Sequence, residues 1–184
     1  MTPRIRTASL FAALAAFLWV SNAWAGDVAI MGEDAARAMQ RGERLVQEGH
    51  YKDASAEFER ASDLAAAPCP DCLLGVGRAY SGARQYDAAL HVTRMALALY
   101  SSPQGQARAY EQLGTILALK GEMSSAREAY GKAVQLDGQM AAQVRTSFAQ
   151  ALLKRANYDS PKSSEGAAAN VAQEVAAAAG APRK

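Results

Sequence analysis

Two cysteines stand close together in this chain, separated by the dipeptide Pro-Asp. Cys69 and Cys72 are its only cysteines, and thiols at this spacing can form a disulfide, carry out thiol–disulfide exchange or bind a metal. A zinc site needs about four ligands, and only two separated histidines, His50 and His91, could add to the cysteines. Covalent attachment of haem needs a histidine directly after the second cysteine, where this chain has Leu73. We therefore predict no bound metal and no cofactor.

The first 25 residues have the composition of a secretory signal peptide. Arg4 and Arg6 form a basic start, and an uncharged apolar run of 11 residues follows over 10–20. A helix needs about 20 residues to span a bilayer, so an uncleaved membrane anchor is the weaker alternative. The segment 23–25 is Ala-Trp-Ala, with the small side chains that a signal peptidase requires. We expect cleavage after Ala25, export to the bacterial periplasm or beyond, and no stable membrane span in the mature chain.

Export bears on the cysteine pair, because thiols pair in the oxidising compartments that exported proteins enter. Residues three apart at the start of a helix have Cα atoms about 5–5.5 Å apart, which a disulfide accepts. We predict a small structural disulfide between Cys69 and Cys72. A redox enzyme or accessory that uses the same two thiols is the alternative, although a redox motif of this type normally stands in a βαβ setting. No convincing strand pattern occurs between Asp27 and the 150s.

The charge of the mature chain argues against two classes of partner. Removal of residues 1–25 leaves 18 basic and 18 acidic residues. A chain without net charge has no global field to steer it to nucleic acid or to an anionic membrane. The sequence also shows no supported Ser-His-Asp grouping and no phosphate-binding glycine loop. We therefore predict a protein that is not an enzyme and does not bind nucleic acid.

Three stretches repeat the same residue types at a nearly constant spacing. Their matching alanines are Ala54, Ala89 and Ala126, which are 35 and 37 residues apart. Apolar residues follow each alanine at the spacing of one helix face, and turn-forming residues separate the helices. The turns expected inside the hairpins are Gly49-His50, Arg84-Gln85 and Gly121-Glu122, and those between hairpins are 67–70, 101–103 and Asp137-Gly138.

The remaining segments complete the expected layout. Ser102 before Pro103 predicts the N-cap and first residue of a helix. The segment 139–156 has the periodicity of one more amphipathic helix, suited to cap the array. We predict a lead-in over 26–34, a repeat array with its capping helix over 35–156, and a disordered alanine-rich tail over 157–184.

These patterns resemble the tetratricopeptide repeat family, whose period is about 34 residues. The first-helix pattern is clearest in Leu73…Val76-Gly77…Tyr80 and in Tyr110…Leu113-Gly114…Leu117. The chain departs from the pattern at Ala38, Arg41, Thr93 and Asp137-Gly138. The resemblance implies an all-α, right-handed solenoid of three helical hairpins. In such an array, small residues such as Gly42, Gly77 and Gly114 let paired helices approach closely.

The resemblance also implies a function and its location. Such arrays are scaffolds that hold a protein or peptide on a concave surface lined by the first helix of each hairpin. Self-association of the chain is a further alternative. The charged clamp that chaperone-binding members use is absent from the matching positions. The residues expected to bind the partner are Met39, Glu43, Leu74, Arg78, Arg108, Glu111 and Thr115, among which Arg78 is the expected anchor.

Overall fold

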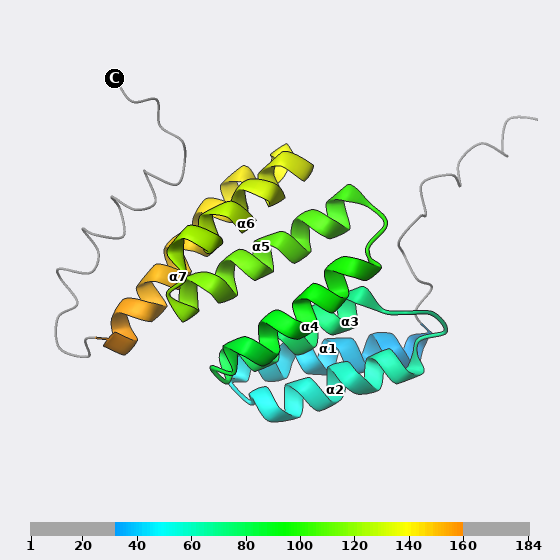
Figure 1. The fold of residues 1–184 in the computed structure, drawn as a ribbon. Coiled ribbons are helices and arrows are strands. Elements are labelled where there is room, and N and C mark those ends of the chain that lie inside the picture. The colour runs from blue at the N-terminus through cyan, green and yellow to red at the C-terminus, as the bar shows by residue number, and fades with distance from the viewer. Residues whose placement is uncertain (1–31, 160–184) are drawn as a thin grey trace, which may run out of the picture.

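The computed structural model describes residues 32–159, so the predicted signal peptide and nearly all of the predicted tail lie outside the described residues. Within this range the chain forms α-helices and one short 3-10 helix, with no strand (Figure 1). None of the described helices is both long and apolar enough to cross a membrane. The elements are α1 (Glu33–Glu48), α2 (Tyr51–Leu64), α3 (Pro70–Gly82), α4 (Tyr86–Leu99), α5 (Pro103–Lys120), α6 (Met123–Leu136), η1 (Gly138–Met140) and α7 (Ala141–Asp159).

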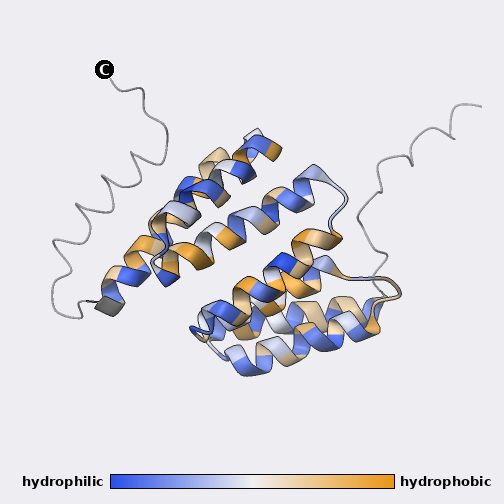
Figure 2. Ribbon diagram, in the orientation of Figure 1, coloured by the Kyte–Doolittle hydropathy of each residue, from blue (hydrophilic) through white to orange (hydrophobic). Residues whose placement is uncertain are grey.

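The helices stack as a linear array. The pairs α1–α2, α3–α4 and α5–α6 form three hairpins, and each hairpin packs on the next through α2 against α3 and α4 against α5. Apolar and polar residues alternate along the helices at helical spacing, so that each helix has an apolar side for its neighbours (Figure 2). The predicted all-α solenoid with a C-terminal capping helix is confirmed.

The turn inside each hairpin has the same backbone geometry. Gly49, Arg84 and Gly121 all lie in the left-handed region, with φ of 82°, 62° and 99°. The next residue of each turn donates its backbone N–H to the carbonyl five positions earlier, which closes the end of the first helix. The middle turn keeps this geometry with arginine, although left-handed backbone costs a residue with a side chain about 1–2 kcal/mol.

Side-chain caps begin two of the first helices. The Ser102 hydroxyl accepts a hydrogen bond from the Gly105 N–H at 3.1 Å, and Pro103 is the first residue of α5. The cap predicted from this Ser-Pro pair is confirmed. At the start of α3, Cys69 takes the cap position before Pro70, and its sulfur accepts the backbone N–H of Cys72 at 3.2 Å.

The helices of the first and third hairpins meet where a glycine faces an aromatic ring. A Cβ atom added at Gly42 would lie 2.7 Å from the Phe58 ring, and one added at Gly114 would lie 2.8 Å from the Tyr130 ring. Any larger residue would therefore push the two helices apart. Both aromatic side chains are buried. The close approach expected from these small residues is present in the structure.

The two helices of the second hairpin pack closely at the matching position, but through different residues. Thr93 takes the place of the aromatic residue and is fully buried. Its smaller volume leaves room for Gln112 of the next hairpin, whose Nε2 donates to Thr93 Oγ1 at 3.2 Å and to the Leu74 carbonyl at 2.9 Å. Gly77 lies against both polar groups. The departure from the repeat pattern at Thr93 is thus matched by Gln112.

The capping helix packs mainly against α5 and much less against α6. Phe148 on this helix meets Tyr130 edge to face, with ring centroids 5.4 Å apart. The Asp137 carboxylate accepts the Gln139 N–H at 3.0 Å and begins η1, so α7 starts two residues after the predicted start. It continues to Asp159, three residues beyond the predicted end.

A pair of glycine substitutions tests the close packing. A Cβ atom at Gly75 would overlap the buried Phe58 ring, whereas one at Gly131 on α6 would meet nothing within 4 Å. We expect Gly75→Ala to lower the free energy of unfolding by about 1–3 kcal/mol. Gly131→Ala should raise it by about 0.5–1 kcal/mol, because alanine favours helix. Urea denaturation followed by circular dichroism measures both, and equal effects would contradict this account of the packing.

Candidate functional site

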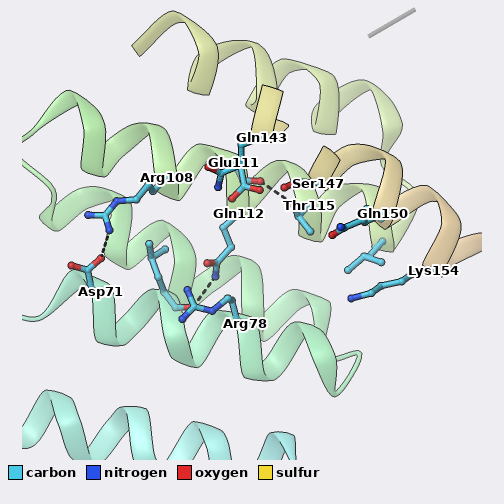
Figure 3. Close-up of a pocket in the computed structure, with 13 residues that line it drawn as sticks. Asp71, Arg78, Arg108, Glu111, Gln112, Thr115, Gln143, Ser147, Gln150 and Lys154 are labelled. Atoms are coloured by element: carbon cyan, nitrogen blue, oxygen red, sulfur yellow. Dashed lines mark hydrogen bonds and ion pairs between the residues drawn. The ribbon is translucent and has the colours of Figure 1, made fainter. Parts of the chain in front are cut away.

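A groove lies between α3, α5 and α7 on the side formed by the first helices of the hairpins. Its main cavity has a volume of about 340 Å³, and a second cavity of about 280 Å³ continues it toward the first hairpin. Both cavities are bordered by Arg78, Gln112, Thr115, Leu119 and Lys154. We call these two cavities together the concave groove. Figure 3 shows the main cavity, with side chains converging on it from all three helices.

Five of the seven residues predicted to bind a partner line this groove, and two do not. Leu74, Arg78, Arg108, Glu111 and Thr115 border the main cavity. Met39 is instead packed, half-buried, against apolar clusters inside the first two hairpins. Glu43 does not line either cavity, but its carboxylate contacts the Arg78 guanidinium. Binding by these residues stays a prediction.

The sequence-based prediction missed the contribution of α7. Four polar residues of this helix line the main cavity at steps of four, three and four positions. This stripe runs beside the apolar stripe that packs against the array, so its helical spacing could have identified it. The residues are Gln143, Ser147, Gln150 and Lys154.

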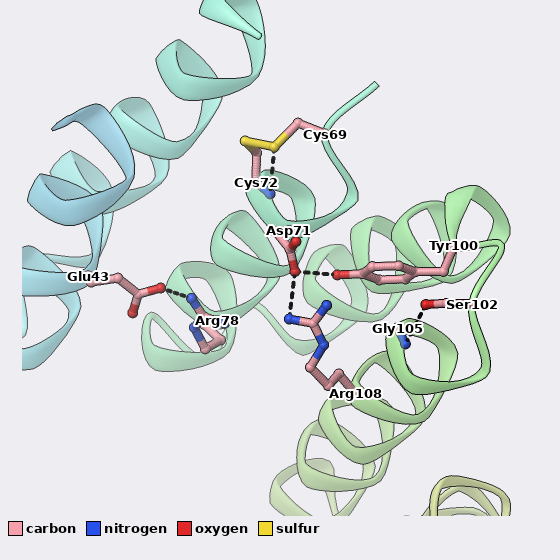
Figure 4. A network of polar contacts seen from close by, with 9 residues as sticks. All are labelled: Glu43, Cys69, Asp71, Cys72, Arg78, Tyr100, Ser102, Gly105 and Arg108. Atoms are coloured by element: carbon pink, nitrogen blue, oxygen red, sulfur yellow. Dashed lines mark hydrogen bonds and ion pairs between the residues drawn. A yellow bond between two sulfur atoms is a disulfide. The ribbon is translucent and has the colours of Figure 1, made fainter. Parts of the chain in front are cut away.

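Asp71, inside the cysteine motif, organises one end of the groove. Its carboxylate accepts a hydrogen bond from the Tyr100 hydroxyl at 2.6 Å and forms an ion pair with Arg108 at 3.0 Å (Figure 4). The Arg108 guanidinium lies over the Tyr100 ring, 5.5 Å from its centroid. Burial, together with the hydrogen bond to Asp71, raises the pKa of Tyr100, so its hydroxyl stays a neutral donor. These contacts tie the start of α3 to α4 and α5.

A disulfide joins Cys69 to Cys72 in the structure, with Cα atoms 5.3 Å apart. Cys69 is 4% exposed and Cys72 is fully buried. The bond closes the first turn of α3, which carries Asp71 between the two cysteines (Figure 4). The motif therefore fixes the backbone from which Asp71 reaches Arg108.

Arg78, the expected anchor, is engaged within the protein. Its guanidinium contacts the Glu43 carboxylate of α1 and lies over the Phe58 ring of α2, 5.7 Å from the ring centroid. The Arg78–Glu43 ion pair joins the first two hairpins and is partly exposed, so it contributes at most about 1 kcal/mol. A partner that uses Arg78 must share it with Glu43 or displace Glu43.

Glu111 is placed differently, in the middle of the main cavity. Glu111 is half-buried, and the Ser147 hydroxyl lies close enough to its carboxylate to act as a hydrogen-bond donor. It forms no ion pair with the described residues. Burial raises the pKa of Glu111, while Ser147 and the more distant charge of Arg78 oppose that rise. The groove therefore holds a poorly solvated carboxylate without a cationic partner.

Comparison with known proteins agrees with this architecture. Residues 107–140, which include most of α5 and all of α6, match the family model described as tetratricopeptide repeat. A solved structure titled "Crystal structure of MamA" superposes with a TM-score of 0.51 and 19% sequence identity, over 79% of this chain and 78% of that one. No curated protein matches the sequence.

The family-model match confirms the resemblance of the repeat pattern to the tetratricopeptide repeat family over residues 107–140. The MamA likeness, at its low identity, supports the fold alone. Repeats of this type serve in general as scaffolds for protein–protein interaction.

Substitution of Glu111 by glutamine tests how much burial of the charged carboxylate lowers the free energy of unfolding. Glutamine keeps the shape and an acceptor for Ser147 but removes the charge. Because the folded protein holds the Glu111 proton more tightly than the unfolded chain, this group's contribution to stability falls as pH rises from about 4.5 through the raised pKa. We therefore expect the stability advantage of Glu111→Gln over the wild type to grow from pH 4.5 to neutral pH.

Urea denaturation at several pH values measures this advantage. Glu59→Gln, on the exposed side of α2, is the matched control for the loss of one carboxylate. An advantage of Glu111→Gln that stays constant or shrinks over this range would show that burial does not penalise the charge.

Proposed function

We propose that this protein is an exported, non-catalytic scaffold of the bacterial cell envelope that binds an extended segment of a partner protein in the concave groove. The observation that carries the proposal is the groove itself, in which α3, α5 and α7 bring polar side chains around an apolar floor. The N-terminal sequence supports export, because it has the basic start, apolar run and small residues of a signal peptide.

The shape of the groove favours a peptide segment over a compact small molecule. The two cavities share one border and continue from α7 toward the α1–α2 hairpin. Leu74 and Ala151 supply apolar contact in the main cavity, and the exposed amides of Gln143 and Gln150 can bond to a peptide backbone. An extended chain needs this combination of contacts along its length.

The burial of the cysteines supports a structural disulfide over the redox alternative. Thiol–disulfide exchange begins with attack of an external thiolate on one of the two sulfurs. Cys69 and Cys72 are almost inaccessible to such an attack, because they pack with Ala38 and Ala61 in one apolar cluster. We therefore assign the pair to holding the start of α3.

Photocrosslinking in cells tests the location of the partner. A photoreactive amino acid at Gln143 or Gln150 faces the groove, and the same amino acid at the exposed Arg94 of α4 is the control. We expect adducts with the same partner protein from both groove positions and none from position 94, as identified by mass spectrometry. Equal capture from position 94 would contradict binding in the groove, and adducts between two copies of the chain would favour self-association.

Alkylation of thiols tests the role of the disulfide. In a glutathione redox buffer, we expect the folded protein to resist labelling by a maleimide until urea unfolds it, because the sulfurs are buried. Mass spectrometry counts the labels. Rapid labelling of the folded protein in the mildly reducing buffer would instead favour a redox function.

A further inference from the structure

We propose that the concave groove selects a partner segment with one basic and one acidic side chain about three residues apart. The basic side chain would pair with Glu111 and the acidic one with Lys154. This inference rests on the proposed function, because it assumes that the groove holds an extended segment of a protein.

The charges around the groove cancel in pairs, except for two. Asp71 pairs with Arg108, and Glu43 pairs with Arg78. Glu111 and Lys154 are the charged residues that line the main cavity without an ion pair among residues 32–159. They have opposite signs, so the groove as a whole is dipolar, with one anionic and one cationic position.

The anionic position suits a basic side chain and rejects an acidic one. Glu111 is half-buried, and the side chain that acts as a hydrogen-bond donor to its carboxylate is Ser147. A guanidinium offers two parallel N–H donors to a carboxylate, which is the strongest common geometry for such a pair. It would replace the water that Glu111 loses on burial. An acidic group at the same place would add a second uncompensated negative charge.

The spacing between the two positions follows from α7. Ser147 of α7 lies beside Glu111 of α5, and Lys154 lies seven residues farther along α7 than Ser147. Seven residues of helix span about 10 Å, which three residues of extended chain also span, at about 3.3 Å each. Leu119 and Ala151 also border the cavity, so small apolar residues suit the stretch between the two charges.

The basic group belongs to a side chain within the segment and not to a free N-terminus. Glu111 lies between the Asp71–Arg108 end of the main cavity and its Lys154 end (Figure 3). The groove continues past Arg78 and Thr115 into the second cavity. A bound chain can therefore extend on both sides of Glu111.

Synthetic peptides with the purified full-length chain test the inference. The probe is a fluorescent eight-residue peptide of alanine and serine with one arginine and one glutamate three positions apart. The control peptides carry the two charges at adjacent positions, or norleucine in place of the arginine. Titration followed by fluorescence anisotropy should show that the probe binds at least several-fold more tightly than either control.

Charge reversal assigns the contacts to the two residues. We expect Glu111→Gln to weaken binding of the probe about ten-fold, as for loss of a hydrogen bond between charged groups, and Glu59→Gln to leave it unchanged. Glu111→Lys and Lys154→Glu should each abolish binding. The double variant should recover part of it, because the peptide can then bind in the opposite direction. If Glu111→Lys does not fold by circular dichroism, Glu111→Gln and Lys154→Met carry the test.

The outcomes separate this inference from the proposed function. Equal binding of all three peptides, failure of the probe to bind, or indifference to the charges at positions 111 and 154 would overturn the charge selection. Crosslinking of a partner from Gln143 and Gln150 would still support the scaffold function in that case. Loss of those crosslinks as well would overturn both.

Discussion

The rest of the structure depends on one packing constraint, the close contact between the two helices of each hairpin. A glycine of the first helix faces a residue 16 positions later on the second, as Gly42 faces Phe58 and Gly114 faces Tyr130. The residue on the second helix also contacts the following hairpin or the capping helix, as the edge-to-face contact of Tyr130 with Phe148 shows. One side chain per repeat thus sets both the closure of its hairpin and the stacking of the next helix.

Complementary volumes keep this contact intact where the repeats differ. Phe58 is large, and the next hairpin offers Gly75 to its ring. Thr93 is small, and the next hairpin offers Gln112, which fills the space and bonds to it. Gln112 also borders both cavities of the groove. The residue that completes the core therefore also borders the candidate binding surface.

The sequence predicted what local rules determine and missed what depends on register between hairpins. The turns at Gly49 and Gly121 and the cap at Ser102 follow from residue types, and the turn at Arg84 follows from its place in the repeat. All appear where expected. Which of the charged residues on the first helices pair with one another could not be predicted. Arg78 and Glu43 are 35 positions apart, and their approach depends on how two hairpins stack. The same holds for α7, whose shift toward α5 adds a polar wall to the groove.

The cysteine motif shows that residues capable of redox chemistry can have a structural role instead. Its two sulfurs are buried, and the residue that acts on the groove is Asp71 between them. Because the disulfide fixes the first turn of α3, Asp71 is held where it binds Tyr100 and Arg108 together. This neutralises Arg108 at one end of the groove, as Glu43 neutralises Arg78 farther along it. Within the described part of the chain, Glu111 and Lys154 remain as the unpaired charges of the main cavity, because its other charged side chains form ion pairs that join neighbouring hairpins.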